Sequence, residues 1–131
     1  MRISIVVAEE LGVGFIANAT ACIASGLFHL EQNIIGSEIV GADFKYIPIT
    51  KIPIMIFKRN KKEWIELLKR AKNNKLKYMV FTKEAQSTTN YDEYALRVKG
   101  KTLKEIQIIG IGVLGEDHLI NSFSGDLALL R

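Results

Sequence analysis

Four short apolar runs, separated by stretches in which apolar residues recur at helical spacing, constrain the fold of this 131-residue chain more than any other feature. The runs are Arg2–Ala8, Ile52–Phe57, Leu76–Phe81 and Ile106–Leu114. Short apolar runs rich in β-branched residues are typical of buried strands. Strands that alternate with helices favour a layered α/β fold. We therefore expect one domain, residues 1–131, built as a three-layer α/β sandwich with a mixed four-stranded sheet and helices on both faces.

Apolar residues three and four positions apart predict the helices between these strands. Capping signals mark some of their ends: Asn60 is a candidate N-cap, with Glu63 as the acid of a capping box, and Gly125 is a candidate stop. A further segment, Ser37–Ile47, alternates only weakly and is interpreted as an irregular excursion or a short edge hairpin. The expected helices are Phe15–Gln32, a helix from Asn60 to near Asn74, Asp92–Lys99 and Glu116–Phe123.

Composition and the N-terminal residues bear on the cellular compartment. No stretch reaches the ~20 consecutive apolar residues of a membrane span. Glu9 and Glu10 end the first apolar run after a few residues, which is not the layout of a signal peptide. Cys22 is the only cysteine, so the chain has no intrachain disulfide framework. These features favour the cytoplasm and no membrane partner.

The net charge of +4 is unevenly distributed. Residues 58–77 carry nine basic and two acidic side chains, a charge of +7, and the rest of the chain carries nine basic and twelve acidic ones, a charge of −3. A basic block of this kind can contact the phosphates of RNA, weakly and without sequence preference. The alternative interpretation is a solvated helix face that keeps the protein soluble.

The densest group of chemically active side chains lies in residues 82–94, directly after the third expected strand. A turn needs only one or two polar residues, so this concentration of hydroxyl, amide and carboxylate groups suggests a site. Glu84 is the candidate general base, with Thr88 beside it. The alternative for Glu84 is a place in the first turn of a short helix capped by Thr82, where the helix dipole favours a carboxylate. Tyr91 and Tyr94 share a helix face and either close a pocket or pack in the core.

Two other patterns carry less weight. Gly12–Ala17 matches the dinucleotide pattern G-x-G-x-x-[GA], but the acids at about the right spacing, Glu31 and Glu38, do not end a strand. A tight turn explains these glycines more simply. His29 and His118 are the only histidines and belong to no ligand-spaced cluster, so we expect no metal site. We expect no cofactor.

Three segments resemble the class-two peptidyl-tRNA hydrolases. In the first segment Val6, Val7, Leu11, Gly14, Ala19 and Cys22 fall in register with that family's N-terminal pattern, and Glu10 stands at its aspartate. The other two segments match its D-A-G-x-T and T-G-x-L-x-L motifs at Glu84, Ala85, Gln86, Ser87, Thr88 and at Ser124, Gly125, Leu127, Leu129. The chain is more similar still to an uncharacterised family of small proteins with this hydrolase fold, through Asn18-Ala19 and the run F-T-x-E-A-Q-S-T-x-x-Y-x-x-Y. The resemblance implies the hydrolase fold.

The hydrolase chemistry is not carried over with the fold. Ala21 and Ala24 replace the hydrolases' glutamine and histidine, and Phe15 and Ala17 replace basic residues of the glycine-rich turn. We therefore expect a binding protein for a small polar or peptide-like ligand, with a divergent ester or amide hydrolase and an RNA-binding module as alternatives, and a homodimer as a possible assembly. The candidate catalytic residues are Glu84 and Thr88, and the expected ligand-binding residues are Asn18, Thr20, Glu84, Gln86, Ser87, Thr88 and Tyr91.

Overall fold

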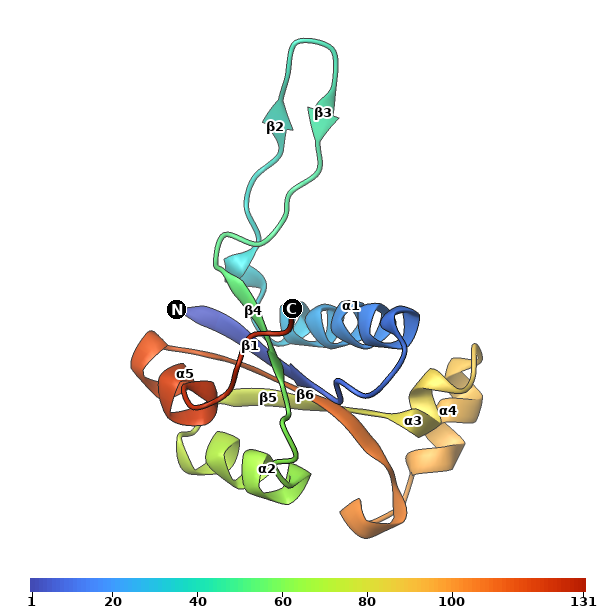
Figure 1. Cartoon of the computed structure of the whole chain (residues 1–131). Helices are drawn as coiled ribbons and strands as arrows, with labels where there is room; N and C mark the ends of the chain where they lie inside the picture. The colour runs from blue at the N-terminus through green and yellow to red at the C-terminus, as the bar shows by residue number, and fades with distance from the viewer.

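A mixed four-stranded sheet forms the centre of the molecule (Figure 1), in a computed structural model that describes every residue from Met1 to Arg131. The strands are β1 (Arg2–Val7), β4 (Ile54–Lys58), β5 (Lys77–Thr82) and β6 (Ile108–Gly115), in the order β4-β1-β6-β5. β1 pairs with β4 in parallel, whereas β6 runs antiparallel to both β1 and β5. The predicted mixed sheet is confirmed, and its four strands are the four apolar runs.

Helices cover both faces of the sheet. Helix α1 (Val13–Leu30) lies on one face, and α2 (Trp64–Asn73) with α5 (Asp117–Ser124) lies on the other. Side chains of a strand point alternately to its two faces, so β1 supplies Ile3 and Ile5 to the α1 side and Val6 to the α2–α5 side. Each side has its own apolar core, and the prediction of helices on both faces is confirmed.

Close contact between α1 and β6 depends on glycine. A Cβ atom at Gly112 would meet the side chains of Ile23 and Leu27 on α1, and one at Gly110 would lie 2.7 Å from Cδ1 of Ile23. The missing side chains allow the helix to approach the strand closely. The position of α1 over the sheet is therefore fixed by two residues of β6.

By length and composition alone, α1 is long and apolar enough to cross a membrane. Its apolar residues are nevertheless interrupted by polar ones, so it contains no unbroken apolar run of ~20 residues. Core helices of soluble proteins pass the same test. Here Ala19, Ile23 and Leu27 of α1 pack on the sheet, and they are the only fully buried residues of the helix. Much of its apolar surface therefore faces outward.

The start of α2 differs from the prediction. The helix begins at Trp64 with Glu63 as its N-cap, and the capping box expected from Asn60 is wrong. Asn60 and Lys61 have φ values of 52° and 64°, a left-handed conformation that no N-cap adopts. The carboxylate of Glu9 explains this turn, because both of its oxygens accept the Asn60 N–H at 3.1 Å. The stabilising group is 51 residues away in sequence, which local spacing does not reveal.

Short elements complete the chain between the main ones. They are η1 (Gln32–Ile34), α3 (Lys83–Gln86), α4 (Tyr91–Val98) and η2 (Leu103–Glu105). Thr82 caps α3 as expected, since its hydroxyl accepts the N–H of Ala85 at 3.3 Å. The predicted helix over residues 92–99 is α4, shifted by one residue.

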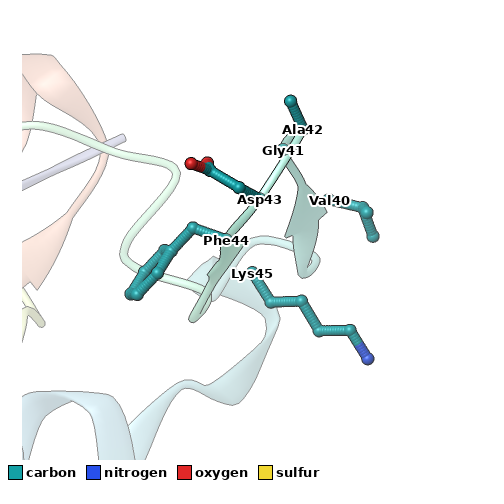
Figure 2. A pocket seen from close by; sticks show the side chains of 6 residues that line it. All are labelled: Val40, Gly41, Ala42, Asp43, Phe44 and Lys45. Carbon is teal, nitrogen blue, oxygen red and sulfur yellow. The ribbon is translucent and has the colours of Figure 1, made fainter.

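A hairpin arm, residues Gly36–Lys51, projects from the body of the molecule (Figure 1). Its strands β2 (Ile39–Val40) and β3 (Lys45–Tyr46) pair with each other in a separate two-stranded sheet. At its tip, Val40 and Lys45 point to one side of the ribbon while Asp43 and Phe44 point to the other (Figure 2). A hairpin therefore forms in this segment, as one alternative predicted, but it is a separate sheet and does not extend the edge of the main one.

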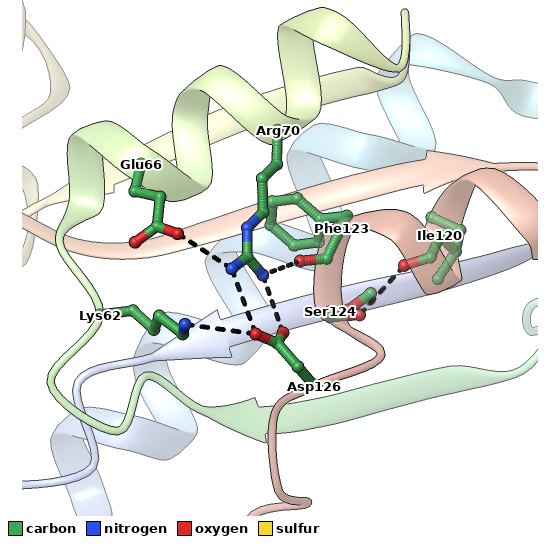
Figure 3. Close-up of polar contacts among 8 residues, drawn as sticks. Lys62, Glu66, Arg70, Ile120, Phe123, Ser124 and Asp126 are labelled. Carbon is green, nitrogen blue, oxygen red and sulfur yellow. Dashed lines mark hydrogen bonds and ion pairs between the residues drawn. The ribbon is translucent and has the colours of Figure 1, made fainter.

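The C-terminal tail is fixed to the body by an ion-pair clamp around Asp126 (Figure 3). Arg70 of α2 donates from both terminal nitrogens to the two carboxylate oxygens, at 2.8 and 3.2 Å, and Lys62 lies 3.3 Å away. Arg70 also donates to the carbonyl of Phe123 at 3.0 Å and pairs with Glu66. Beyond the clamp, the N–H of Lys58 donates to the carbonyl of Ala128, so the tail covers the open edge of β4.

Candidate functional site

The carboxyl ends of three strands gather the predicted site segments at one edge of the sheet. β1 and β5 both run antiparallel to β6, and β4 runs parallel to β1, so β1, β4 and β5 all end at this edge. The chain then enters α1, α2 and α3 respectively. Ligands of α/β sheets bind preferentially outside the carboxyl ends of the strands. This edge is therefore the place to test the residues that the sequence indicates.

Asn18 and Gln86 are the two predicted residues that the fold brings together from distant segments. The side-chain amide of Gln86, at the end of α3, donates from Nε2 to the carbonyl of Phe15 at 2.8 Å and to Oδ1 of Asn18 at 3.1 Å. Both acceptors belong to the first half of α1. The contact joins residues 68 positions apart and connects α3 to α1.

The Phe15 carbonyl determines how both amides are oriented. A carbonyl only accepts, so the atom of Gln86 that faces it must be the nitrogen, and the atom of Asn18 that faces this nitrogen must be the oxygen. Oε1 of Gln86 and Nδ2 of Asn18 form no hydrogen bond within the chain. Asn18 is exposed and Gln86 half-buried, so the bonded pair keeps one free acceptor, Oε1 of Gln86, and one free donor, Nδ2 of Asn18.

Glu84 contacts a different part of the molecule. Its Oε1 accepts the backbone N–H of Gln107 at 3.0 Å, just before β6, instead of a group on α1. The same residue lies in the first turn of α3, as the capping alternative predicted. The carboxylate thus ties α3 to the chain entering β6, and a role in ligand binding or catalysis stays a prediction.

Ser87 and Thr88 are held in a network centred on Arg97, a residue that the sequence analysis missed. Arg97 donates to the Ser87 hydroxyl at 2.9 Å and to the Glu84 carbonyl at 3.2 Å, and pairs with Glu93 at 2.6 Å. The Thr88 hydroxyl donates to the second Glu93 oxygen at 3.0 Å and accepts the N–H of Asn90. The hydrogen bond from Thr88 and the charge of Arg97 hold the pKa of Glu93 below its ordinary value.

This network orders the α3–α4 turn and uses the hydroxyls that a ligand would otherwise meet. The four-residue spacing of Glu93 and Arg97 on a helix is the signal that identifies the ion pair from sequence. Nothing local indicates that Arg97 also reaches back to Ser87, ten residues earlier. The proposed ligand contacts of Ser87 and Thr88 stay predictions.

Thr20 and Tyr91 have other neighbours. The Thr20 hydroxyl donates to the carbonyl of Ala17 at 2.9 Å, within the same helix. Tyr91 is exposed and packs edge to face on Tyr94, with 5.5 Å between the ring centres. Partial burial raises the pKa of the Tyr94 hydroxyl above its ordinary value. The tyrosine pair lies on α4 as expected, and Tyr91 is exposed rather than packed in the core, so its part in closing a pocket or binding a ligand stays a prediction.

The turn between β4 and α2 adds charged groups to the same edge. Arg59 lies over the ring of Trp64, 5.0 Å from the ring centre, and 3.5 Å from a carboxylate oxygen of Glu10. Its Nε is buried and has no hydrogen-bond partner. Stacking on an indole is a favourable position for a guanidinium group. Arg59 therefore connects the loops that follow β1 and β4.

The basic block is partly engaged in ion pairs within the chain. Four of its nine basic residues form ion pairs, namely Arg59, Lys62, Arg70 and Lys77, with Glu10, Asp126, Glu66 and Glu31 among their partners. The other five are Lys58, Lys61, Lys69, Lys72 and Lys75. RNA contact through residues 58–77 stays a prediction, and it rests on five lysines rather than nine basic residues.

Two concavities lie away from the predicted site residues. One, of about 270 Å³, is the bend at the tip of the hairpin arm, lined by Val40–Lys45 (Figure 2). The other, of about 210 Å³, lies between the chain start, the end of α1 and the turn after β6. None of the seven expected ligand-binding residues lines either one. No group of three or more His, Cys, Asp or Glu side chains is arranged to hold a metal ion.

Comparison with known proteins gives the chain a family but no activity. A family model described as a protein of unknown function, DUF2000, matches residues 1–131. The chain belongs to the DUF2000 family. No curated protein matches this chain.

A solved structure confirms that the DUF2000 chain has the fold of at least one other uncharacterised protein. This is the structure of Atu0240, a protein of unknown function from Agrobacterium tumefaciens, with a TM-score of 0.87. The match covers 99% of this chain and 97% of that one, at 17% sequence identity. At that identity the likeness concerns the fold alone.

Proposed function

We propose that this DUF2000 protein binds a small polar or peptide-like ligand at the amide pair Asn18–Gln86, on a fold similar to that of the class-two peptidyl-tRNA hydrolases. The observation that carries the proposal is that the bonded pair keeps a free acceptor on Gln86 and a free donor on Asn18. Their orientation is fixed by the Phe15 carbonyl, so the pair is preorganised before a ligand arrives.

A peptide group matches this pair in its hydrogen-bonding chemistry. Its N–H can donate to Oε1 of Gln86 while a carbonyl accepts from Nδ2 of Asn18. Each such hydrogen bond contributes a net ~1 kcal/mol, so the pair alone supports weak binding. The exposed ring of Phe15 lies next to the pair in sequence and offers apolar contact to a side chain. Ligand sites combine a few oriented polar groups with apolar surface in this way.

Hydrolysis is the less favoured alternative. A hydrolase needs a group that activates water or stabilises the developing charge. Ala21 and Ala24 stand at the hydrolases' glutamine and histidine positions, and the two histidines lie in the last turn of α1 and on α5. We expect no release of free tRNA from a peptidyl-tRNA substrate. Turnover equal to that of an active class-two hydrolase would favour the alternative.

An NMR titration tests the binding proposal. The probe is N-acetylalanine methylamide, the smallest compound with two peptide groups and a side chain, added to ¹⁵N-labelled protein. We expect the side-chain amide signals of Asn18 and Gln86 to shift together, and the shifts to disappear in Gln86→Ala and Asn18→Ala. Ser25→Ala is the matched control, because Ser25 is exposed on the same helix and bonds only to the Cys22 carbonyl. Shifts that persist in both amide variants would refute the proposed site.

A further inference from the structure

The hairpin arm, Gly36–Lys51, carries six of the fourteen exposed large apolar side chains of the molecule. Six large apolar side chains on it have 54–83% of their surface exposed. They are Ile39, Val40, Phe44, Tyr46, Ile47 and Ile49. Isolated exposed apolar residues are ordinary, but a contiguous group marks an interaction surface.

Both faces of the arm are apolar. Ile39 and Tyr46 are opposite each other in the ladder, and Phe44 stacks edge to face on Tyr46 with 5.4 Å between ring centres. Val40 lies on the other face together with Lys45 (Figure 2), and Ile47 and Ile49, which follow β3, are also exposed. A ribbon that merely lay on its own protein would bury one face and expose a polar one. The arm therefore presents apolar side chains that its own chain does not cover.

The arm also has little to stabilise it by itself. Its two strands share two ladder positions, Ile39↔Tyr46 and Val40↔Lys45. An isolated two-stranded hairpin is only marginally stable in water. At its base the Gly36 N–H donates to the Ile49 carbonyl at 2.8 Å, and the Lys51 N–H to the Ile34 carbonyl at 2.6 Å. These bonds fix where the arm leaves the body and leave its apolar side chains uncovered.

The charge of the arm indicates the kind of partner. Glu38 and Asp43 balance Lys45 and Lys51, so the arm has no net charge. Surfaces that bind phosphate backbones or anionic lipid carry an excess of lysine and arginine. A neutral arm rich in isoleucine, tyrosine and phenylalanine has the composition of the core of a protein–protein interface.

The same chain carries an apolar surface on which such an arm can dock. The outward side of α1 presents Val13, Ala17 and Ala21, all exposed, with the half-buried Phe28 on the same line of the helix. Only three of the 18 residues of α1 are buried, although most of its residues are apolar. Two uncovered apolar surfaces on one chain are complementary in a two-fold dimer, where each copy gives an arm and receives one.

We propose that the partner is a second copy of this chain, with the arm of each copy lying across the outward side of α1 in the other. The area is sufficient. At roughly 150 Å² for a fully exposed large apolar side chain, the six residues present on the order of 600 Å². If half of each arm is covered, two arms and the two surfaces beneath them bury about 1,200 Å², which is within the range of stable interfaces. The arm also lies within the span over which Atu0240 matches this chain.

Sedimentation velocity of the whole chain and three variants tests the proposal. The arm variant is Ile47→Ser with Ile49→Ser, and the acceptor variant is Ala21→Glu. The control is Leu96→Ser on α4, because Leu96 is 75% exposed and Ile49 is 76% exposed. All the substituted residues except the control belong to the proposed interface. Circular dichroism melts check that each variant stays folded.

We expect the native protein and the Leu96→Ser control to sediment at twice the 14.7 kDa of one chain, and both interface variants at 14.7 kDa. Interfaces of about 1,600 Å² have Kd values from roughly micromolar to picomolar, so loading at about 100 μM, well above that range, must reveal a dimer with an interface of about 1,200 Å². A native monomer at that concentration overturns the proposal. A dimer that survives the arm substitutions overturns it as well, and one that survives only Ala21→Glu overturns the assignment of α1 as the acceptor. Arm-dependent flotation of a native monomer with phosphatidylcholine–phosphatidylglycerol vesicles would identify a membrane surface instead.

Discussion

Replacing Asp126 with asparagine should destabilise the protein by about 1 kcal/mol at pH 7, and the loss should depend on pH. The Arg70 guanidinium, which donates two hydrogen bonds to this carboxylate, lowers the pKa of Asp126 from 3.8 to about 2, with Lys62 adding a smaller effect. At 1.36 kcal/mol per pKa unit, this lowering of the pKa corresponds to about 2.4 kcal/mol of stabilisation of the folded chain. The side chain is 49% exposed, so solvent screening reduces the expected contribution to about 1 kcal/mol.

The direction of the pH dependence follows from the lowered pKa. Above 3.8 the carboxylate is ionised in both the folded and the unfolded chain, and its full contribution stabilises the fold. As the pH falls from 3.8 toward about 2, the unfolded chain takes up the proton first and the contribution is lost. Near pH 3 about half of it should remain.

Urea unfolding of the native protein and Asp126→Asn at pH 7, 5 and 3 measures this difference. Asp43→Asn is the control, because Asp43 lies at the tip of the arm and forms no ion pair with a neighbour. We expect the difference in free energy of unfolding between the native protein and Asp126→Asn to shrink as the pH falls. The difference between the native protein and Asp43→Asn should stay near zero at every pH. A constant difference from pH 7 to 3 would show that Asp126 acts through packing, and equal stability at pH 7 would show that the clamp contributes nothing.

Three further predictions concern α1, Glu84 and the basic block. Gly112→Ala should lower the free energy of unfolding by about 1–3 kcal/mol, because its Cβ meets Ile23 and Leu27. Gly14→Ala should be neutral or stabilising by up to ~1 kcal/mol, because this helical position has open space at its Cβ. Equal urea midpoints for the two variants would contradict the close packing of α1 on β6. Glu84→Ala should lower the free energy of unfolding by about 1 kcal/mol through loss of the Gln107 hydrogen bond, and leave binding of N-acetylalanine methylamide at Asn18 and Gln86 unchanged. Loss of binding in a variant of native stability would instead place Glu84 in the site. If single-stranded RNA binds, a plot of log affinity against log salt concentration should have a slope no steeper than about −3.5. Five lysines of residues 58–77 are free of ion pairs, and each neutralised phosphate contributes about −0.7 to the slope. Tight RNA binding that is insensitive to salt would exclude this surface.

The sequence predicts the layers of the fold well because burial determines both pattern and position. Arg2–Ala8 and Ile106–Leu114 are mostly apolar, as strands with a helix layer on each side are expected to be. β1 and β6 are these runs, within one or two residues. The three- and four-residue spacing in Phe15–Gln32 likewise predicts α1, which needs Ala19, Ile23 and Leu27 on one side to cover the sheet.

The parts that sequence does not predict depend on contacts between distant residues. The left-handed turn at Asn60 follows from Glu9, and the polar contact inside the core is a hydrogen bond between Ser4 and Ser124, whose hydroxyl oxygens lie 2.7 Å apart. Neither has a local signature. The sequence also does not predict that the arm projects from the body. The weak alternation in Ser37–Ile47 does not distinguish a hairpin that packs on the body from one that extends away from it.

The candidate site divides in the same way. Residues 82–94 follow the third expected strand and lie at the carboxyl edge of the sheet, where Gln86 contacts Asn18, and the site expected from their many polar groups stays a prediction. The pattern does not separate residues that face solvent from those that hold the turn together. Ser87 and Thr88 belong to the second group because Arg97 and Glu93, further along the chain, bond to them.

A crystal structure with bound N-acetylalanine methylamide tests the central claim most directly, because it locates the ligand atom by atom. The account predicts the probe at the carboxyl edge of the sheet, with a peptide N–H within hydrogen-bonding distance of Oε1 of Gln86 and a carbonyl oxygen within that distance of Nδ2 of Asn18. The Gln86–Phe15 hydrogen bond should be unchanged by binding. Probe density elsewhere on the molecule, or an unoccupied amide pair in crystals whose probe concentration saturates the NMR titration, would contradict it.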